Sequence, residues 1–66
     1  MIIPMIIAAI PALNEETAIG SVVLRAKQHV DAVIVVDDGS YDKTAKIAEL
    51  AGASVIRHDV NRGKGM

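Results

Sequence analysis

Val33-Ile34-Val35-Val36-Asp37-Asp38-Gly39-Ser40 is the most informative segment of this chain. Its four consecutive apolar residues, three of them valine, are typical of a strand buried on both faces of a parallel sheet. Two adjacent carboxylates stand where the strand should end. Ligands bind at the carboxyl ends of the strands in open α/β sheets, so these carboxylates could bind a sugar, a base or a metal. The alternative is a turn whose aspartates bond their own backbone and cap the next helix.

Length and composition point to one small domain with an aliphatic core. The chain has 66 residues, 52% of them hydrophobic, with no Cys, Trp or Phe and with Tyr41 as its single aromatic residue. Such a core suits helices packed on a parallel sheet. Without cysteine there is no disulfide framework, thiolate metal site or cysteine nucleophile. The net charge of −1 gives no electrostatic argument for binding nucleic acid or an anionic membrane.

The apolar stretch 1–13 is predicted to be a strand rather than a targeting or membrane segment. It has no basic start, and Glu15 and Glu16 follow where a cleavage region would lie. It is also shorter than the ~20 residues that a helix needs to span a bilayer. We therefore expect no transmembrane segment, and a cytoplasmic protein or the soluble part of something larger.

Five elements are predicted, in the order β-α-β-α-β. They are the strands 5–10, 32–36 and 54–57 and the helices 14–29 and 43–51. Pro11 should end the first strand, because it cannot donate to the ladder. Asn14 should cap the first helix and Asp42 or Ser40 the second, which Gly52 should terminate. One apolar face is expected on each helix: Ile19, Val22, Val23, Ala26 and Val30 on the first, and Ala45, Ile47, Ala48 and Leu50 on the second.

This order predicts an α/β fold, the β-α-β-α-β half of a doubly wound, mainly parallel sheet with strand order 3-2-1. The first strand would then lie at an edge, although it is apolar throughout and natural edges are usually protected. Either further strands follow from residues missing here, or another chain supplies them, so we expect a homo-oligomer through this strand. Residues 1–66 are interpreted as a single truncated half-domain with no second domain.

Three polar segments should meet at the carboxyl edge of the sheet. They are 11–16, 37–40 and 58–65. The helix start at 14–17 offers backbone N–H groups, Asp37 and Asp38 offer acceptors, and Arg62 and Lys64 lie among glycines and could neutralise phosphates. Each segment also has a simpler interpretation, namely a strand stop with a helix cap, a capping turn and a solvated tail.

Several other kinds of site are not supported by the spacing of residues. His29 and His58 lack metal-ligand spacing and are interpreted as surface or packing residues. The dinucleotide fingerprint Gly-x-Gly-x-x-Gly would have to follow the first strand, where this chain has Pro11-Ala12-Leu13-Asn14. The P-loop pattern is also missing, because Lys64 is followed by Gly65 and not by Ser or Thr.

Taken together, three ordered motifs resemble the amino-terminal part of family 2 glycosyltransferases, and most closely their dolichyl-phosphate mannose synthase-like branch. They are Ile10-Pro11-Ala12-Leu13-Asn14-Glu15-Glu16, Val35-Val36-Asp37-Asp38-Gly39-Ser40 with Asp42 and Thr44, and Asn61-Arg62-Gly63-Lys64-Gly65. The resemblance covers nearly the whole chain. It implies a glycosyltransferase A fold that binds a nucleotide-activated sugar, usually a UDP- or GDP-sugar, at the strand ends.

The resemblance also implies a set of substrate-binding residues. They are Pro11, Leu13 and Glu15 at the base and ribose, Val36 and Asp38 lining the same pocket with Asp37 beside them, and Arg62 and Lys64 near the base or phosphates. The family often has Tyr at the position of Leu13, so a stacking contact would be lost here. Asp37 and Asp38 are both expected to face the ligand.

The metal site and the catalytic base of this family lie later in its sequence. Its metal-binding Asp-x-Asp does not occur in these 66 residues, and Asp37-Asp38 is adjacent rather than spaced. We therefore assign no metal or catalytic residue and expect Mg²⁺ or Mn²⁺ only in a full-length family member. Three hypotheses follow: a truncated piece of a glycosyltransferase that is inactive alone, a free-standing nucleotide-binding or oligomerising module, and a relic without a ligand.

Overall fold

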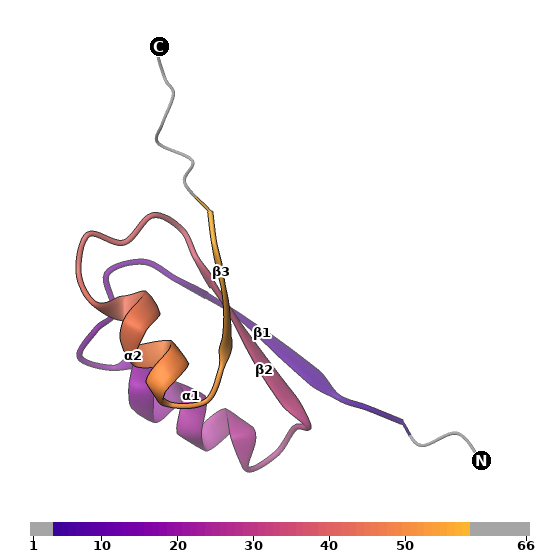
Figure 1. The fold of residues 1–66 in the computed structure, drawn as a ribbon. Helices are drawn as coiled ribbons and strands as arrows, with labels where there is room; N and C mark the ends of the chain where they lie inside the picture. Colours follow the sequence, from indigo (N-terminus) through magenta and orange to yellow (C-terminus); the bar gives the residue numbers. More distant parts are fainter. Residues whose placement is uncertain (1–3, 59–66) are drawn as a thin grey trace.

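The computed structural model describes residues 4–58 as a β-α-β-α-β unit (Figure 1). Its elements are β1 (Ile7–Ala12), α1 (Ile19–Lys27), β2 (Ala32–Asp37), α2 (Thr44–Leu50) and β3 (Ser54–Arg57). The strands pair in parallel in the order β1-β2-β3, so β2 is central and the predicted order 3-2-1 is confirmed. The α/β architecture predicted from the sequence is therefore the observed one.

Both helices cover the same face of the sheet, as right-handed crossovers in one direction require (Figure 1). The buried core lies between this face and the helices, and it consists of Ala12, Ile19, Val23, Val33, Val35, Ala48 and Ala53. Along β2, Val33 and Val35 are buried, whereas the alternate residues Ile34 and Val36 are only half-buried. The expected burial of this strand on both faces is therefore observed on the helix-covered face alone.

β1 does not end at Pro11, as predicted, but continues to Ala12. The carbonyl oxygens of Ile6 and Ala12 both accept hydrogen bonds from the β2 side. Residues at even positions therefore direct their backbone polar groups to β2, and the nitrogen of Pro11, at an odd position, faces the free edge. A proline there costs no ladder hydrogen bond, so the strand can pass through it.

α1 begins at Ile19, five positions later than the predicted cap Asn14. The geometric N-cap is Ala18, which makes no side-chain capping bond. Asn14 instead has a positive φ of 51° and lies in the loop between β1 and α1. The capping role assigned to Asn14 is therefore wrong, because its side chain bonds to a different loop.

α2 ends at the glycine that its sequence predicts, but its geometric N-cap is Lys43, which makes no side-chain capping bond, and not Asp42 or Ser40 as predicted. Oδ1 of Asp42 accepts the backbone N–H of Thr44, the first residue of the helix, at 2.9 Å. Gly52 follows the C-cap Ala51 with a φ of 106°, and its N–H donates to the carbonyl of Glu49. This backbone conformation favours glycine, which explains why the helix ends there.

The helix faces are narrower than the apolar stripes predicted from the sequence. Ile19 and Val23 are buried, but Val22 is 41% exposed and Leu50 at the end of α2 is 78% exposed. The opposite face of the sheet is uncovered by any described element, and Ile7 and Ile56 are about half exposed on it. Of the helices within residues 4–58, none is long and apolar enough to cross a membrane.

Candidate functional site

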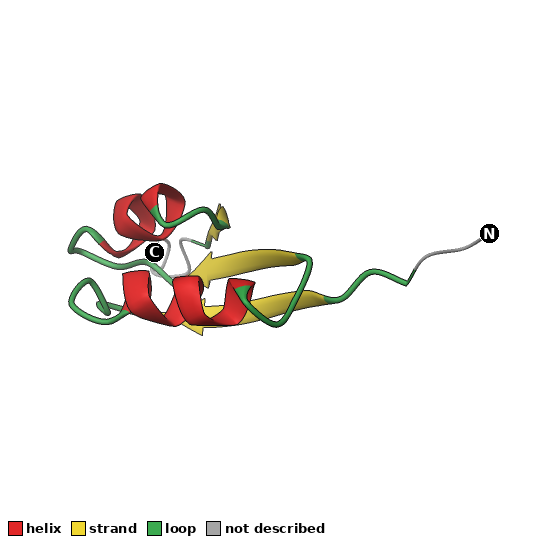
Figure 2. Ribbon diagram, turned by 90° about the horizontal axis from the view of Figure 1, so that it is seen from below, coloured by secondary structure: helices red, strands yellow, loops and turns green. Residues whose placement is uncertain are grey.

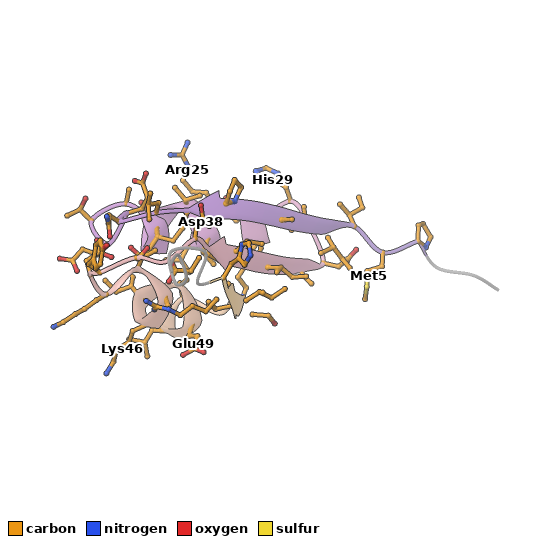
Figure 3. All side chains as sticks on the ribbon, turned by 90° about the horizontal axis from the view of Figure 1, so that it is seen from above. Met5, Arg25, His29, Asp38, Lys46 and Glu49 are labelled. Atoms are coloured by element: carbon orange, nitrogen blue, oxygen red, sulfur yellow. The ribbon has the colours of Figure 1, made fainter. Side chains whose placement is uncertain are left out.

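A shallow pocket of about 200 Å³ lies at the carboxyl end of β1 and β2. Its lining consists of Pro11, Ala12, Leu13, Glu15 and Asp38. The structure therefore brings together four of the eight residues that the sequence predicted for one site. Asp38 is labelled in Figure 3, where it lies beyond the end of the central strand.

The parallel pairing of β1 with β2 explains why these residues meet. Ala12 and Asp37 are partners in the register, and the N–H of Asp38 donates to the carbonyl oxygen of Ala12 at 2.9 Å. Asp38 is thus held next to the loop that carries Leu13 and Glu15. The side chain of Asp38 is 51% exposed and Glu15 is also exposed, so both carboxylates can accept hydrogen bonds from a ligand.

Asp37 is placed differently from its neighbour, because successive side chains of a strand point to opposite faces. Its side chain is fully buried on the helix-covered face, and Oδ1 accepts the backbone N–H of Ser40 at 3.0 Å and the Ser40 hydroxyl. We expected both aspartates to face a ligand, but only Asp38 lines the pocket. Asp37 holds the turn that follows β2.

An ion pair between β2 and β3 completes the surroundings of Asp37. Oδ2 of Asp37 lies 3.2 Å from Nη1 of Arg57, although the angle does not make this contact a hydrogen bond. Nη2 of Arg57 donates to the carbonyl oxygen of Ser40 at 2.6 Å. Arg57 is the register partner of Asp37 at the end of β3. The turn at Ser40 is therefore held from two sides.

Three side chains between the end of β2 and the first residue of α2 accept hydrogen bonds from three consecutive backbone amides of the loop after β1. The amide of residue 14 donates to Oγ of Ser40 at 2.8 Å, that of residue 15 to Oγ1 of Thr44 at 2.7 Å, and that of residue 16 to Oδ2 of Asp42 at 3.2 Å. Thr44 is fully buried and its hydroxyl also donates to Oδ1 of Asp42.

Hydrogen bonds in the opposite direction join the same two loops. The amide of Tyr41 donates to Oδ1 of Asn14 at 2.8 Å, and the amide of Lys43 donates to Oε1 of Glu16 at 2.9 Å. We call these five bonds between residues 14–16 and 40–44 the inter-loop network. The positive φ of Asn14 directs both its amide and its side chain to the second loop.

The carboxylate of Asp42 is stabilised in its ionised form by the donors around it. The hydrogen bond from the Thr44 hydroxyl holds the pKa of Asp42 below its ordinary value. Backbone N–H groups of Thr44 and Glu16 act in the same direction, since they also stabilise the ionised form. Asp42 therefore accepts its three hydrogen bonds as a carboxylate near neutral pH.

His58 is a neighbour of the pocket that sequence reasoning assigned to the surface. Its side chain is exposed, but Nδ1 lies 3.6 Å from Oδ1 of the pocket residue Asp38. Its backbone N–H donates to the carbonyl oxygen of Asp37 at 2.7 Å, which fixes the end of β3 beside the end of β2. The sequence feature that could have identified His58 as a neighbour of the pocket is its position directly after β3.

The remaining predicted residues are not in the pocket lining. Val36 is half-buried on the uncovered face of β2, as the register partner of Pro11. Arg62 and Lys64 lie outside the residues that the structure describes. Within the described part of the chain, no group of three or more His, Cys, Asp or Glu side chains could hold a metal ion.

Sequence comparison finds relatives over nearly the whole chain. Residues 7–66 match the model of the family described as Glycosyl transferase family 2. The chain is 46% identical over 61 residues to uncharacterized protein MJ1222 of Methanocaldococcus jannaschii, a match that covers 91% of this chain and 25% of that protein. It is 46% identical over 54 residues to the glucosyl-3-phosphoglycerate synthase of Mycolicibacterium smegmatis, with 76% of this chain and 18% of that enzyme covered.

Comparison with solved structures also finds relatives of this chain. The glucosyl-3-phosphoglycerate synthase of Mycobacterium tuberculosis is 40% identical with a TM-score of 0.71, over 80% of this chain and 22% of that one. A structure of that enzyme in complex with Mn²⁺, UDP-glucose and phosphoglyceric acid has a TM-score of 0.70 at 40% identity, with 80% and 21% covered.

These matches establish the family and the fold. The chain spans a quarter or less of the length of each of these relatives. Its open parallel sheet matches the glycosyltransferase A fold of the solved structures. Kinship with the dolichyl-phosphate mannose synthase-like branch stays a prediction. Because the family model matches all but the first six residues, the chain belongs to glycosyl transferase family 2.

Proposed function

We propose that this chain forms part of the donor site of a glycosyltransferase and binds the nucleotide of a UDP- or GDP-sugar. The observation that carries this proposal is the pocket at the sheet edge, where Pro11, Leu13, Glu15 and Asp38 meet. Membership of glycosyl transferase family 2 supports it. The M. tuberculosis relative was solved with UDP-glucose, which makes uridine nucleotides the first ligands to test.

The chemistry of the pocket suits a nucleoside better than a phosphate. Glu15 and Asp38 provide exposed carboxylates that can accept hydrogen bonds from ribose hydroxyls or a base N–H. Pro11 and Leu13 provide apolar surface for the face of a base. Two carboxylates would repel a diphosphate, so we infer that the diphosphate points away from them, and that Arg62 and Lys64 neutralise it.

Sugar transfer itself is proposed to need more than these residues. The chain contains no Asp-x-Asp sequence, and the M. tuberculosis relative was solved with Mn²⁺. We infer that residues 1–66 are half of a donor-binding domain, and that Mg²⁺ or Mn²⁺ is held by other residues of a full-length protein. A cytoplasmic location is part of this proposal, and fractionation of cells that make the tagged protein would test it.

Calorimetric titration of the full chain with UDP, GDP and their sugars tests the donor site. We expect Asp38→Asn to weaken the binding of the preferred nucleotide about tenfold, since it weakens a charge-assisted hydrogen bond. Glu49→Gln is the matched control, because it changes an exposed carboxylate on α2 in the same way, away from the pocket. Absence of heat at millimolar nucleotide would overturn the proposal.

A second function, self-association as a binding module, is supported by the free edge of β1. Among residues 4–58, β2 is the one strand paired with it, and Met5, Ile6 and Ile7 are each more than half exposed. We propose that a second copy of the chain covers this edge, because a long apolar edge strand is a template for pairing.

A further inference from the structure

We propose that the hydroxyl of Thr44 is a positioning group for the nucleotide pocket, because it holds the backbone amide of the pocket residue Glu15. Thr44 lies in α2 and does not line the pocket. It would act on the ligand only through the loop after β1. This inference rests on the proposed function of that pocket.

The Thr44 hydroxyl uses both of its hydrogen-bonding capacities in a fixed direction. Its hydrogen is donated to Oδ1 of Asp42, which leaves its lone pairs for the N–H of Glu15 at 2.7 Å. The side chain is fully buried, so water cannot replace either bond. Because Asp42 is held as a carboxylate, it accepts and never competes to donate. The orientation of the hydroxyl is therefore determined by the protein.

The loop that donates this hydrogen bond carries two residues of the pocket lining. Residues 13–18 lie between β1 and α1 without regular secondary structure, and they include Leu13 and Glu15. Ordering such a loop when a ligand binds costs conformational entropy. Thr44 and Ser40 hold two consecutive amides of this loop through hydrogen bonds within the protein. The pocket wall is thereby preorganised.

Ser40 also holds the loop after β1, and Ser40 is itself held by Asp37 and Arg57. Its hydroxyl accepts the amide of Asn14 at 2.8 Å and donates to the buried carboxylate of Asp37. Arg57 holds the carbonyl oxygen of the same residue at 2.6 Å. A displacement of Thr44 or Ser40 would therefore be passed to the pocket through successive backbone groups, without any contact between these side chains and the ligand.

Two substitutions separate this positioning role from simple packing. Thr44→Val keeps the branched shape and removes the hydroxyl, whereas Thr44→Ser keeps the hydroxyl and removes a buried methyl group. If Thr44 positions Glu15, nucleotide affinity should fall in Thr44→Val, which lacks the hydroxyl, and be kept in Thr44→Ser. If Thr44 only fills space, nucleotide affinity should fall in Thr44→Ser, which lacks the methyl group, and be kept in Thr44→Val. Thr17→Val is the matched control, because Thr17 is exposed in the loop after β1.

The experiment measures the affinity of each variant of the full chain for UDP by calorimetry, together with its thermal midpoint. We expect Thr44→Val to bind UDP about tenfold more weakly, the change typical of one lost hydrogen bond to a buried group. Thr44→Ser should bind within about twofold of the parent despite a lower thermal midpoint. A folded Thr44→Val variant with parental affinity, or an affinity that follows the thermal midpoint, would overturn the inference.

Hydrogen exchange of the Glu15 amide distinguishes failure of this inference from failure of the proposed function. If the parent chain binds no nucleotide, the donor site is wrong, but the exchange rate still tests whether Thr44 positions the loop. We expect faster exchange of this amide in Thr44→Val and in Ser40→Ala, and unchanged exchange in Thr44→Ser and Thr17→Val. Unchanged exchange in Thr44→Val and Ser40→Ala would refute positioning directly.

Discussion

Asp37 and Asp38 are adjacent in the sequence, but their carboxylates have separate roles in the structure. The side chain of Asp37 is fully buried, accepts hydrogen bonds from Ser40 and forms an ion pair with Arg57, whereas that of Asp38 is half exposed at the pocket. The alternation of side chains along β2 separates them. Substitution of Asp37 should therefore affect folding, and substitution of Asp38 should affect binding.

Asp37→Asn is predicted to lower the free energy of unfolding by about 2 kcal/mol, because it places an amide N–H₂ group against the Arg57 guanidinium and leaves buried polar groups unpaired. Urea denaturation monitored by circular dichroism measures this change. Asp38→Asn is the control, and it should leave the unfolding free energy within about 0.5 kcal/mol of the parent. Equal stability of Asp37→Asn and the parent would contradict the structural role of Asp37.

Among the elements, polar side chains, backbone amides and one glycine determine how each helix is connected to the sheet. α1 begins only after the loop 13–18, whose amides bond to side chains of the next loop. α2 begins at Thr44, whose amide donates to the Asp42 carboxylate, and it ends just before Gly52, whose φ is positive. Short polar side chains and one glycine therefore determine where the helices lie relative to the strands.

Gly52→Ala is predicted to destabilise the protein by about 1–2 kcal/mol, because a residue with a Cβ atom is strained at this φ. The added Cβ would also lie 2.2 Å from Nζ of Lys27, so that side chain would have to move. The thermal midpoint and urea denaturation report the loss. Glu49→Ala, at an exposed position of the same helix, should change stability by no more than about 0.5 kcal/mol. A neutral Gly52→Ala substitution would be inconsistent with the observed helix end.

For the molecule as a whole, the elements described within residues 4–58 cover the sheet on one face only. Both helices pack on the same face, and the beginning of the described chain extends beyond the end of the sheet (Figure 2). Ile7 and Ile56 remain more than half exposed on the other face. Apolar surface of this kind is usually covered in a stable protein. The proposed self-association rests on the free edge of β1, next to which Ile7 lies.

Ile7→Lys is predicted to convert the chain from an oligomer to a monomer, because a charge on the edge strand opposes pairing with a second copy. Sedimentation velocity at increasing protein concentration measures the state of association. Leu50→Lys is the matched control, since Leu50 is 78% exposed on α2, and it should associate like the parent. A parent chain that remains a stable monomer at high concentration would exclude association through β1.

Most of the fold could be predicted from the sequence, because its signals are local. The apolar run at Val33, the stop at Gly52 and the short strand 54–57 each identify an element within a few residues. Two boundaries could not be predicted in this way. Pro11 continues β1 because its nitrogen faces the free edge, and Asn14 does not cap α1 because its side chain bonds to Tyr41. Both boundaries depend on how these two residues are placed relative to other elements of the fold.

Sequence patterns alone predict the order of elements, the parallel sheet and the edge at which the polar residues gather. Long-range contacts are what place Asp38 in the pocket lining, bury Asp37, and bring Ser40 and Thr44 into hydrogen bonds with the opposite loop. The reason is distance along the chain. Local patterns arise between residues a few positions apart, whereas the bonds of the inter-loop network join residues 26 to 29 positions apart.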